Sequence, residues 1–243
     1  MNLIALEAVE VDADGRVHLT GDRARHLRHV LSVTPGQEIR VGILDGPVGH
    51  GKVVATDDAG VTLVCEFGET PARPRVDLLL ALPRPKVLRR LWAQIAALGV
   101  GRVMLTNAER VERSYFDTHF LDPQIYRPLL VEGLQQARDT RVPIVTTHKQ
   151  FRVLIEDDLT ALVGDVNRFV ADPSGESSMS GLRRSTTTSR VLIAIGPEGG
   201  WNRFELDLLR EHHFTSVSMG PRTLRVDTAC VAILALLNDS LAN

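Results

Sequence analysis

Two glycine-containing loops hold the side chains of this sequence that are best suited to bind a ligand and act on it. The first loop, residues 196–200 (GPEGG), directly follows the apolar run VLIAI, and the second, residues 219–225 (MGPRTLR), follows the strand pattern TSVSM. After the first loop, Asn202 and Glu205 have the spacing of a reciprocal helix cap. Glycine lets backbone groups approach a ligand closely, and ligands of open α/β sheets bind outside the carboxyl ends of strands. The two loops therefore predict one shared binding pocket, although GPEGG by itself also fits a tight structural turn.

Three charged residues in these loops suit polar chemistry on a bound ligand. Glu198 could accept a proton, and Arg222 and Arg225 carry fixed positive charge that would stabilise an anion. The phosphate-binding patterns GxxxxGKS/T and GxGxxG after a strand do not occur in the sequence. A P-loop NTPase and a dinucleotide-binding Rossmann domain therefore lack their main sequence support.

Metal and disulfide chemistry have little support in the sequence. The eight histidines have neither an HExxH pattern nor i,i+4 pairs, and the two cysteines, Cys65 and Cys230, cannot build a disulfide framework or a four-cysteine zinc site. We therefore expect no metal and a reducing, cytoplasmic setting. Every apolar run is shorter than the ~18 residues of a membrane span, and the start, MNLIALEAVEVDADG, lacks the basic region of a secretory signal.

Positive charge is concentrated locally. The formal net charge of −2 argues against a protein that coats nucleic acid by bulk charge. Residues 76–150, however, carry 11 basic and 7 acidic side chains, and further basic residues gather at 23–29 inside an acidic N-terminal region. Most of the basic residues are arginines, which suit bidentate phosphate contacts, and an arginine-rich composition is the alternative explanation.

A stretch with two prolines and a glycine, residues 68–75, divides the chain into two predicted domains, 1–70 and 76–243. Before it, short alternating runs separated by turn residues predict a small β-barrel. One short helix with the predicted N-cap Asp22 interrupts these strands. The apolar stripe of this helix consists of Leu27, Val30 and Leu31.

After the linker, apolar runs alternate with helical patterns, which predicts an α/β domain with a mostly parallel sheet. The predicted strands are 76–82, 102–106, 142–147, 168–171, 191–195 and 215–219. A helix that opens at Pro83 and Pro85 has one apolar and one basic face and ends at Gly99. A second helix covers 123–137, and the Ser/Thr-rich segment 173–190 is predicted to be a mobile surface excursion.

The last predicted helix, residues 226–237 (VDTACVAILALL), is apolar on nearly every face after its first turn. A helix of this kind is buried all round. Its own domain, a partner subunit or both must therefore cover it, and we expect a homodimer.

Three parts of the sequence together resemble one enzyme family. They are IGPEGGWNRFELDLLREHHFTSVSMGPRTLRVDTACVAILALL, HLRHVLSVTPGQEIRVGILDG and ALGVGRVMLTNAERV. They resemble segments of the RsmE family of 16S rRNA (uracil-N3)-methyltransferases, which belongs to the SPOUT superfamily. The resemblance implies an N-terminal PUA-like β-barrel that binds RNA and a C-terminal SPOUT α/β domain with a deep trefoil knot. It further implies S-adenosyl-L-methionine as cofactor, a homodimer, and methylation of a uridine N3 in 16S rRNA, in the assembled small ribosomal subunit.

The resemblance also implies roles for individual residues. The cofactor pocket would be lined by Ile195, Gly196, Glu198, Gly199, Gly200, Met219, Gly220, Leu224, Arg225, Thr228 and Ala229. Uracil N3 is a poor nucleophile while it carries its proton. We therefore hypothesise that Arg225, with Arg222 beside it, positions the uracil or stabilises its anion, and that Glu198 or a substrate phosphate takes the proton. Candidates for phosphate contacts with RNA are Arg23, Arg25, Arg28, Arg84, Lys86, Arg110, Arg113 and Arg138.

Several positions depart from the family pattern and leave alternatives open. They are Gln94, Ala97, the run from Gln135 to Asp139, and Asp227. These departures leave the two cofactor loops unchanged and bear on the RNA target. The first alternative is a SPOUT methyltransferase that acts on another rRNA or tRNA position. The second is a non-catalytic RNA-binding factor of ribosome assembly that has kept the fold.

Overall fold

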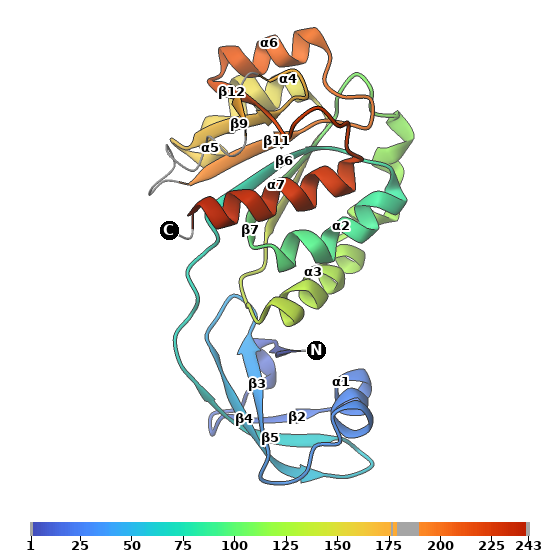
Figure 1. Ribbon diagram of the computed structural model, residues 1–243. Coiled ribbons are helices and arrows are strands. Elements are labelled where there is room, and N and C mark those ends of the chain that lie inside the picture. Colours follow the sequence, from blue (N-terminus) through green and yellow to red (C-terminus); the bar gives the residue numbers. More distant parts are fainter. Residues whose placement is uncertain (1, 176, 179–189, 242–243) are drawn as a thin grey trace. The chain divides into compact units, whose positions relative to one another are not determined.

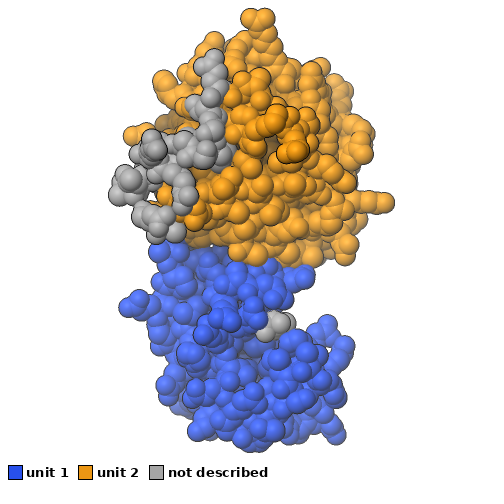
Figure 2. Space-filling model, in the orientation of Figure 1, with its two compact units in different colours: residues 1–73, 131–142 blue, residues 74–130, 143–243 orange. Residues whose placement is uncertain are grey.

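The computed structural model describes residues 2–175, 177–178 and 190–241, and Figure 1 shows the order of their helices and strands. The chain divides into two compact units (Figure 2). Unit 1 consists of residues 1–73 and 131–142, and unit 2 consists of residues 74–130 and 143–243. The sequence places 131–142 in the second predicted domain, whereas the structure groups these residues with the first unit.

Unit 1 is built on a five-stranded sheet of mixed direction. β1 runs parallel to β3, and the other neighbouring strands are antiparallel. Alternate side chains such as Leu19 and Leu63 fill the core, as the period of two predicts. All predicted strands of this region are confirmed, and β1 adds one that was not predicted. The strands, in the order β1-β3-β4-β5-β2, are β1 (Ile4–Leu6), β3 (Glu38–Ile43), β4 (Val48–Thr56), β5 (Val61–Phe67) and β2 (Arg16–Leu19).

The short helix of unit 1 differs from its prediction. α1 spans Gly21–Arg25 with Thr20 at the N-cap position, so the prediction of Asp22 as the cap was wrong. A π-helical turn, His26–Val30, follows directly. Its wider turn rotates later residues away from an α-helical face. Leu27 is therefore fully buried, whereas Val30 is 67% exposed and Leu31 is 41% exposed, which breaks the predicted apolar stripe.

Unit 2 is an α/β unit around a seven-stranded sheet in which all neighbouring strands are parallel. β6 and β11 lie side by side near its centre and are buried at every position, which explains their continuous apolar runs. This confirms the predicted α/β class. In the order β10-β12-β9-β11-β6-β7-β8, the strands are β10 (Ser177–Ser178), β12 (Phe214–Ser218), β9 (Asn167–Ala171), β11 (Val191–Ile195), β6 (Val76–Ala81), β7 (Val100–Thr106) and β8 (Ile144–His148).

Helices cover both faces of this sheet. α2 (Pro85–Ala97) and α7 (Val226–Leu241) pack against each other and against β6, β7 and β11, and α6 (Arg203–Glu211) packs against β12. In Figure 1 α4, α5 and α6 lie on the face opposite α2 and α7. The remaining helical segments are α3 (Pro123–Ala137), α4 (Phe151–Val153), a π turn (Leu154–Asp158), α5 (Leu159–Val163), and the 3-10 turns Ala8–Glu10, Arg113–Asp117 and His119–Leu121. The helical stretch from 151 to 163 was not predicted.

α2 and α7 differ in how well their faces are covered. α2 buries its predicted apolar face, including Trp92, exposes its basic face, and ends before Gly99, whose φ of +69° favours glycine. α7 buries one face through residues such as Ile233 and Leu237, yet Leu236 on its other side is 44% exposed in the single chain. The prediction that this helix is buried all round therefore does not hold within one chain. In the described part of the chain, no helix is both long and apolar enough to span a membrane.

Candidate functional site

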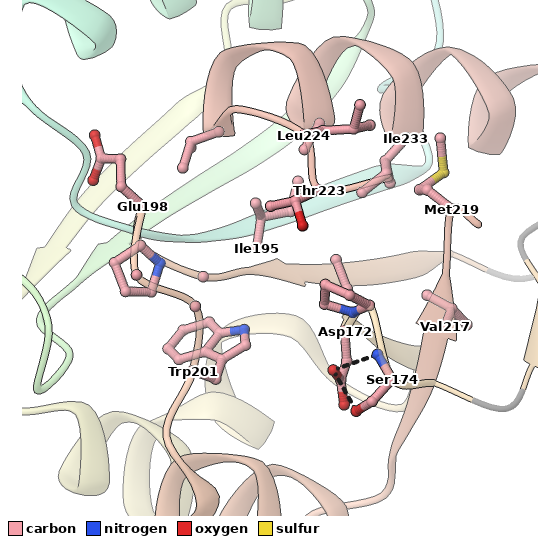
Figure 3. Close-up of a pocket in the computed structure, with 18 of the residues that line it drawn as sticks. Asp172, Ser174, Ile195, Glu198, Trp201, Val217, Met219, Thr223, Leu224 and Ile233 are labelled. Atoms are coloured by element: carbon pink, nitrogen blue, oxygen red, sulfur yellow. Dashed lines mark hydrogen bonds between the residues drawn. The ribbon is translucent and has the colours of Figure 1, made fainter. Parts of the chain in front are cut away.

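A cavity of about 350 Å³ lies at the carboxyl ends of β9, β11 and β12 in unit 2 (Figure 3). Its walls come from residues 171–174 after β9, 195–201 after β11, the loop after β12, and the first turns of α7. β9 lies between β11 and β12 in the sheet, so three strand ends converge where the sequence predicted two. Ile195, Leu224 and Ile233 give the cavity an apolar wall.

The structure brings together most of the predicted pocket residues. Those that line the cavity are Ile195, Gly196, Glu198, Gly199, Gly200, Met219, Gly220, Arg222, Leu224 and Ala229. Arg225 and Thr228 do not line it, and Arg225 instead lines a neighbouring hollow. The binding role of each residue remains a prediction.

The GPEGG loop is fixed at its end by the start of α6. Asn202 accepts a hydrogen bond from the Glu205 N–H (2.8 Å), and Glu205 accepts one from the Asn202 N–H (2.8 Å). This reciprocal cap confirms the prediction from the Asn-x-x-Glu spacing. Glu205 is only 3% exposed, and its other oxygen accepts the Glu109 N–H (2.7 Å). One buried carboxylate thus ties the loop to the segment after β7.

Glycine is required in this loop because other side chains pack directly on it. A Cβ on Gly196 would lie 3.0 Å from the Trp201 indole nitrogen, and a Cβ on Gly199 would lie 2.9 Å from the Arg110 side chain. The Arg110 guanidinium donates a hydrogen bond to the Gly199 carbonyl. Arg110, which the sequence offered as a phosphate contact, therefore supports the loop backbone.

Glu198 points out of the cavity, toward the start of α2. One of its carboxylate oxygens accepts a hydrogen bond from the backbone N–H of Arg84 (3.1 Å). In Figure 3 the carboxylate is directed away from Asp172 and Trp201. Its position places it between the cavity and a second hollow of about 510 Å³.

This second hollow, which we call the Arg225 hollow, shares a wall with the first cavity. Pro197, Glu198, Thr223, Leu224 and Val226 line both of them. The remaining lining residues of the Arg225 hollow are Arg84, Val87, Arg225 and Asp227. It therefore brings the start of α2, the GPEGG loop and the start of α7 together around two arginines and two carboxylates.

The charges around the Arg225 hollow are organised by Asp227. Its carboxylate accepts a hydrogen bond from Arg90 (2.7 Å), and the Arg225 Nε lies 3.7 Å from its other oxygen. Burial is the largest single influence and would raise the pKa of Asp227, but the hydrogen bonds from Arg90 and the Thr228 N–H, together with the charges of Arg225 and Arg90, outweigh it and hold this pKa below its usual value. The side chain of Arg225 is 76% exposed, so its guanidinium is available to a ligand.

Sequence reasoning missed several residues of the cavity, among them Asp172, Ser174 and Trp201. Asp172 directly follows β9, and Ser174 lies at the start of the predicted surface excursion 173–190, most of which, 179–189, lies outside the described residues. Trp201 directly follows the last glycine of GPEGG and packs against Phe151, with ring centroids 5.3 Å apart. Trp201 could have been assigned to the cavity from its place directly after the GPEGG loop in the sequence. Asp172 could be assigned to it only from the order of the strands in the sheet.

A family model described as RNA methyltransferase domain matches residues 70–238. The chain belongs to this RNA methyltransferase family. The matched residues include all three strand ends of the cavity and the Arg225 hollow. Membership in the family therefore covers the whole candidate site.

Named relatives and a solved structure agree with this family. Ribosomal RNA small subunit methyltransferase E from Treponema pallidum is 30% identical over 242 residues, which are 98% of this chain and 90% of the relative. Ribosomal RNA small subunit methyltransferase E 1 from Borreliella burgdorferi is 22% identical and covers 93% of this chain and 94% of its own. The structure of Ribosomal RNA small subunit methyltransferase E from Neisseria gonorrhoeae bound to S-adenosyl methionine has a TM-score of 0.77 at 18% identity, over 99% of this chain and 98% of that chain. The last comparison shows that the mixed α/β fold is shared.

The residues predicted to contact RNA are divided between the two units. In unit 2, Arg84, Lys86 and Arg113 are exposed, and Arg84 also lines the Arg225 hollow. The candidates in unit 1 are Arg23, Arg25, Arg28 and Arg138. Arg23 is paired with Glu10, Arg25 with Asp22 and Arg28 with Asp58. Among the residues that the structure describes, no three metal-ligating side chains form a group that could hold a metal ion.

Proposed function

We propose that this protein transfers the methyl group of S-adenosyl-L-methionine to N3 of a uridine in 16S rRNA. The observation that carries the proposal is the cavity at three converging strand ends, which lies inside the part of the chain matched by the RNA methyltransferase family. The relatives named Ribosomal RNA small subunit methyltransferase E support the rRNA substrate, and the structure bound to S-adenosyl methionine supports the cofactor. We further propose that the protein acts in the cytoplasm, with the ribosomal subunits.

The residues of the cavity fit this cofactor. An apolar wall of Ile195, Leu224 and Ile233 suits the faces of an adenine ring. The glycines of the two loops leave backbone groups accessible for hydrogen bonds. The volume of about 350 Å³ lies within the range of small-molecule sites. When bound, the cofactor would supply an electrophilic methyl group on a positively charged sulfur; the methyl–sulfur bond would break as the N–C bond forms, and S-adenosylhomocysteine would leave.

We propose that the Arg225 hollow receives the uracil. N3 can attack only after it loses its proton, because the N–H electron pair must become available to form the new N–C bond. Fixed positive charge lowers the energy of the resulting uracil anion. Arg225 is placed to provide this charge, with Arg222 on the same loop. Glu198 borders both hollows and is the candidate proton acceptor, with a substrate phosphate as the alternative.

The finer fold features belong to this proposal. We propose that unit 2 forms the deep trefoil knot of SPOUT methyltransferases and that unit 1 is a PUA-like barrel that binds RNA. The exposed cations of α2 and the exposed Arg113, all in unit 2, would contact RNA phosphates. The exposed apolar side of α7 around Leu236 favours a homodimer, and a monomeric mass in light scattering would contradict that part.

The decisive experiment measures methyl transfer to assembled small ribosomal subunits and to deproteinised 16S rRNA, followed by mapping of the modified nucleotide. We expect one N3-methyluridine, formed with S-adenosyl-L-methionine as donor. A modified base in tRNA or at another atom would favour a different SPOUT activity. Binding of rRNA with neither methyl transfer nor cofactor binding would favour the non-catalytic assembly factor.

A further inference from the structure

Four basic residues of unit 1 make no ion pair or side-chain hydrogen bond within the described part of the chain. The other basic residues of this unit have partners. Four of them pair with carboxylates, namely Arg23, Arg25, Arg28 and Arg73, and Arg141 donates hydrogen bonds to two backbone carbonyls. The unpaired ones, all exposed, are Arg16, Arg40, Lys52 and Arg138. The cations that unit 1 leaves available to a ligand are therefore not the arginines of α1.

Three of these four residues lie on one face of the five-stranded sheet. Arg40 on β3 is the register partner of His50 on β4. Lys52, two residues further along β4, belongs to the row that ends at Arg16 on β2. Side chains two residues apart on a strand point to the same face, and Val41, next to Arg40, points into the core on the other face. We call the side that carries the cations the outer face.

Arg138 lies at the same face. Gly42, two residues after Arg40 on β3, is so close to the segment after α3 that an added Cβ would lie 2.5 Å from the Thr140 side chain. This segment therefore packs on the outer face. Arg40, His50 and Arg138 line one pocket of about 500 Å³ there. All residues that line the pocket belong to unit 1.

The backbone of Arg138 is a second indication of a binding role. Arg138 directly follows α3 and has a φ of +61°. Glycine is the usual residue at such a position, because a side chain there costs about 1–2 kcal/mol. Residues other than glycine that keep this conformation cluster at functional sites. The Arg138 guanidinium has no partner in the described part of the chain that would offset the cost.

We propose that the outer face of unit 1 binds phosphate groups of the rRNA substrate. Arg40 and Arg138 hold one phosphate in the pocket, and Lys52 and Arg16 contact neighbouring phosphates. This inference rests on the proposed function, which makes unit 1 an RNA-binding unit. The planar guanidinium suits bidentate phosphate contacts, and cations without an internal partner keep their charge for the ligand.

Carboxylates on the same face give the proposal a second sign to test. Glu66 and Glu69 also line the pocket, and Glu38 lies two residues before Arg40 on β3. β4 separates β3 from β5, so the backbones of Arg40 and Glu66 are about 10 Å apart. None of the three carboxylates is ion-paired within the described residues. They therefore leave the cations free and repel a bound phosphate.

The test measures equilibrium binding of the full chain to deproteinised 16S rRNA at several salt concentrations, without turnover. Arg40→Gln and Arg138→Gly each remove one positive charge, and Glu66→Gln removes one negative charge. Glycine relieves the left-handed backbone at 138, so this variant should fold at least as well as the wild type. The control for net charge is Arg152→Gln, because Arg152 is an exposed arginine of unit 2 that is bonded to Glu156.

Each phosphate contact contributes about 0.7–0.9 to the slope of log affinity against log salt concentration. We expect Arg40→Gln and Arg138→Gly each to lower this slope by about that amount, which at 0.1 M salt is about a five- to eightfold loss of affinity. Glu66→Gln should bind rRNA about twofold more tightly or better, and Arg152→Gln should bind as the wild type does. A purely structural role of Arg40 or Arg138 would leave the slope unchanged.

Other results would overturn the inference. Unchanged affinity and slope in Arg40→Gln and Arg138→Gly would overturn it alone, as would a larger loss for Arg25→Gln, which would place the RNA on α1. Binding of inorganic phosphate that Arg40→Gln abolishes, with unchanged rRNA binding, would assign the pocket to a free anion. Wild-type protein that binds no rRNA would overturn the proposed function as well. The expected binding losses without any methyl transfer would overturn the proposed function and leave this inference standing.

Discussion

Glu205 gives the sharpest test of how the GPEGG loop is held. Its buried carboxylate accepts the backbone N–H of Asn202 (2.8 Å) and that of Glu109 (2.7 Å). Glu205→Ala would leave both donors without this partner, at about 1–3 kcal/mol each for a buried group. We therefore expect unit 2 to lose about 2–6 kcal/mol of unfolding free energy. Glu205→Gln keeps one acceptor oxygen and should lose about half as much.

The assay for this prediction is urea unfolding followed by tryptophan fluorescence. Both tryptophans, Trp92 and Trp201, lie in unit 2, so the signal reports on that unit. With a slope of about 3 kcal/mol per molar urea, the midpoint for Glu205→Ala should fall by about 0.7–2 M. Glu211→Ala, an exposed site in the last turn of the same helix, is the control and should change little. A loss below about 0.5 kcal/mol for Glu205→Ala, or equal losses for both variants, would refute the assignment.

Three further predictions concern the chemistry and the packing of the site. Arg225→Ala should lower the rate of methyl transfer by about a hundredfold with unchanged calorimetric affinity for S-adenosylhomocysteine; undiminished transfer would remove Arg225 from the mechanism. Gly196→Ala would press a methyl group on the neighbouring indole, 3.0 Å away, and should destabilise unit 2 by about 1–3 kcal/mol; an unchanged urea midpoint and near-ultraviolet circular dichroism would contradict this. The lowered pKa of Asp227 means that its pair with Arg90 stabilises the fold at neutral pH and that this contribution is lost as pH falls through the depressed folded pKa, below the usual 3.8. The difference in unfolding free energy between wild type and Asp227→Asn should therefore shrink as pH is lowered from 7 to about 3, and a constant difference would contradict the pairing.

Local sequence patterns predicted the parts of the site that are set by local rules. The cap formed by Asn202 and Glu205 depends on a spacing of three residues, and it was correctly predicted. The glycine loops were correctly placed after strands because an apolar run followed by glycine is a local signal. β9, the strand that precedes Asp172, was also correctly predicted. Its place in the sheet, between β11 and β12, was not predicted. Strand order depends on pairing between residues far apart in the chain, which no local period encodes.

The contacts of individual arginines could not be predicted from the sequence for a related reason. Charge clusters in a sequence show where cations are numerous and do not show what each one touches. Arg110 belongs to a basic set by composition, yet its side chain lies against Gly199. The apolar stripe of the first helix failed at Val30 because a π turn follows α1, and the period that predicts a stripe assumes α-helical geometry throughout.

Arg90 and Arg225 differ in how closely they contact the carboxylate of Asp227. This difference indicates how the Arg225 hollow could stabilise an anion without pairing its positive charge with that carboxylate. Arg90 is held by Asp227 at 2.7 Å, whereas the Nε of Arg225 lies 3.7 Å from that carboxylate, beyond hydrogen-bond distance. Asp227 thus binds one arginine closely and leaves the guanidinium donors of the other for a ligand. If both arginines were tied to Asp227, the positive charge at the hollow would be largely cancelled before a base arrived. The pair between Arg90 and Asp227 is then best understood as the element that holds the start of α7 in place while Arg225 remains available.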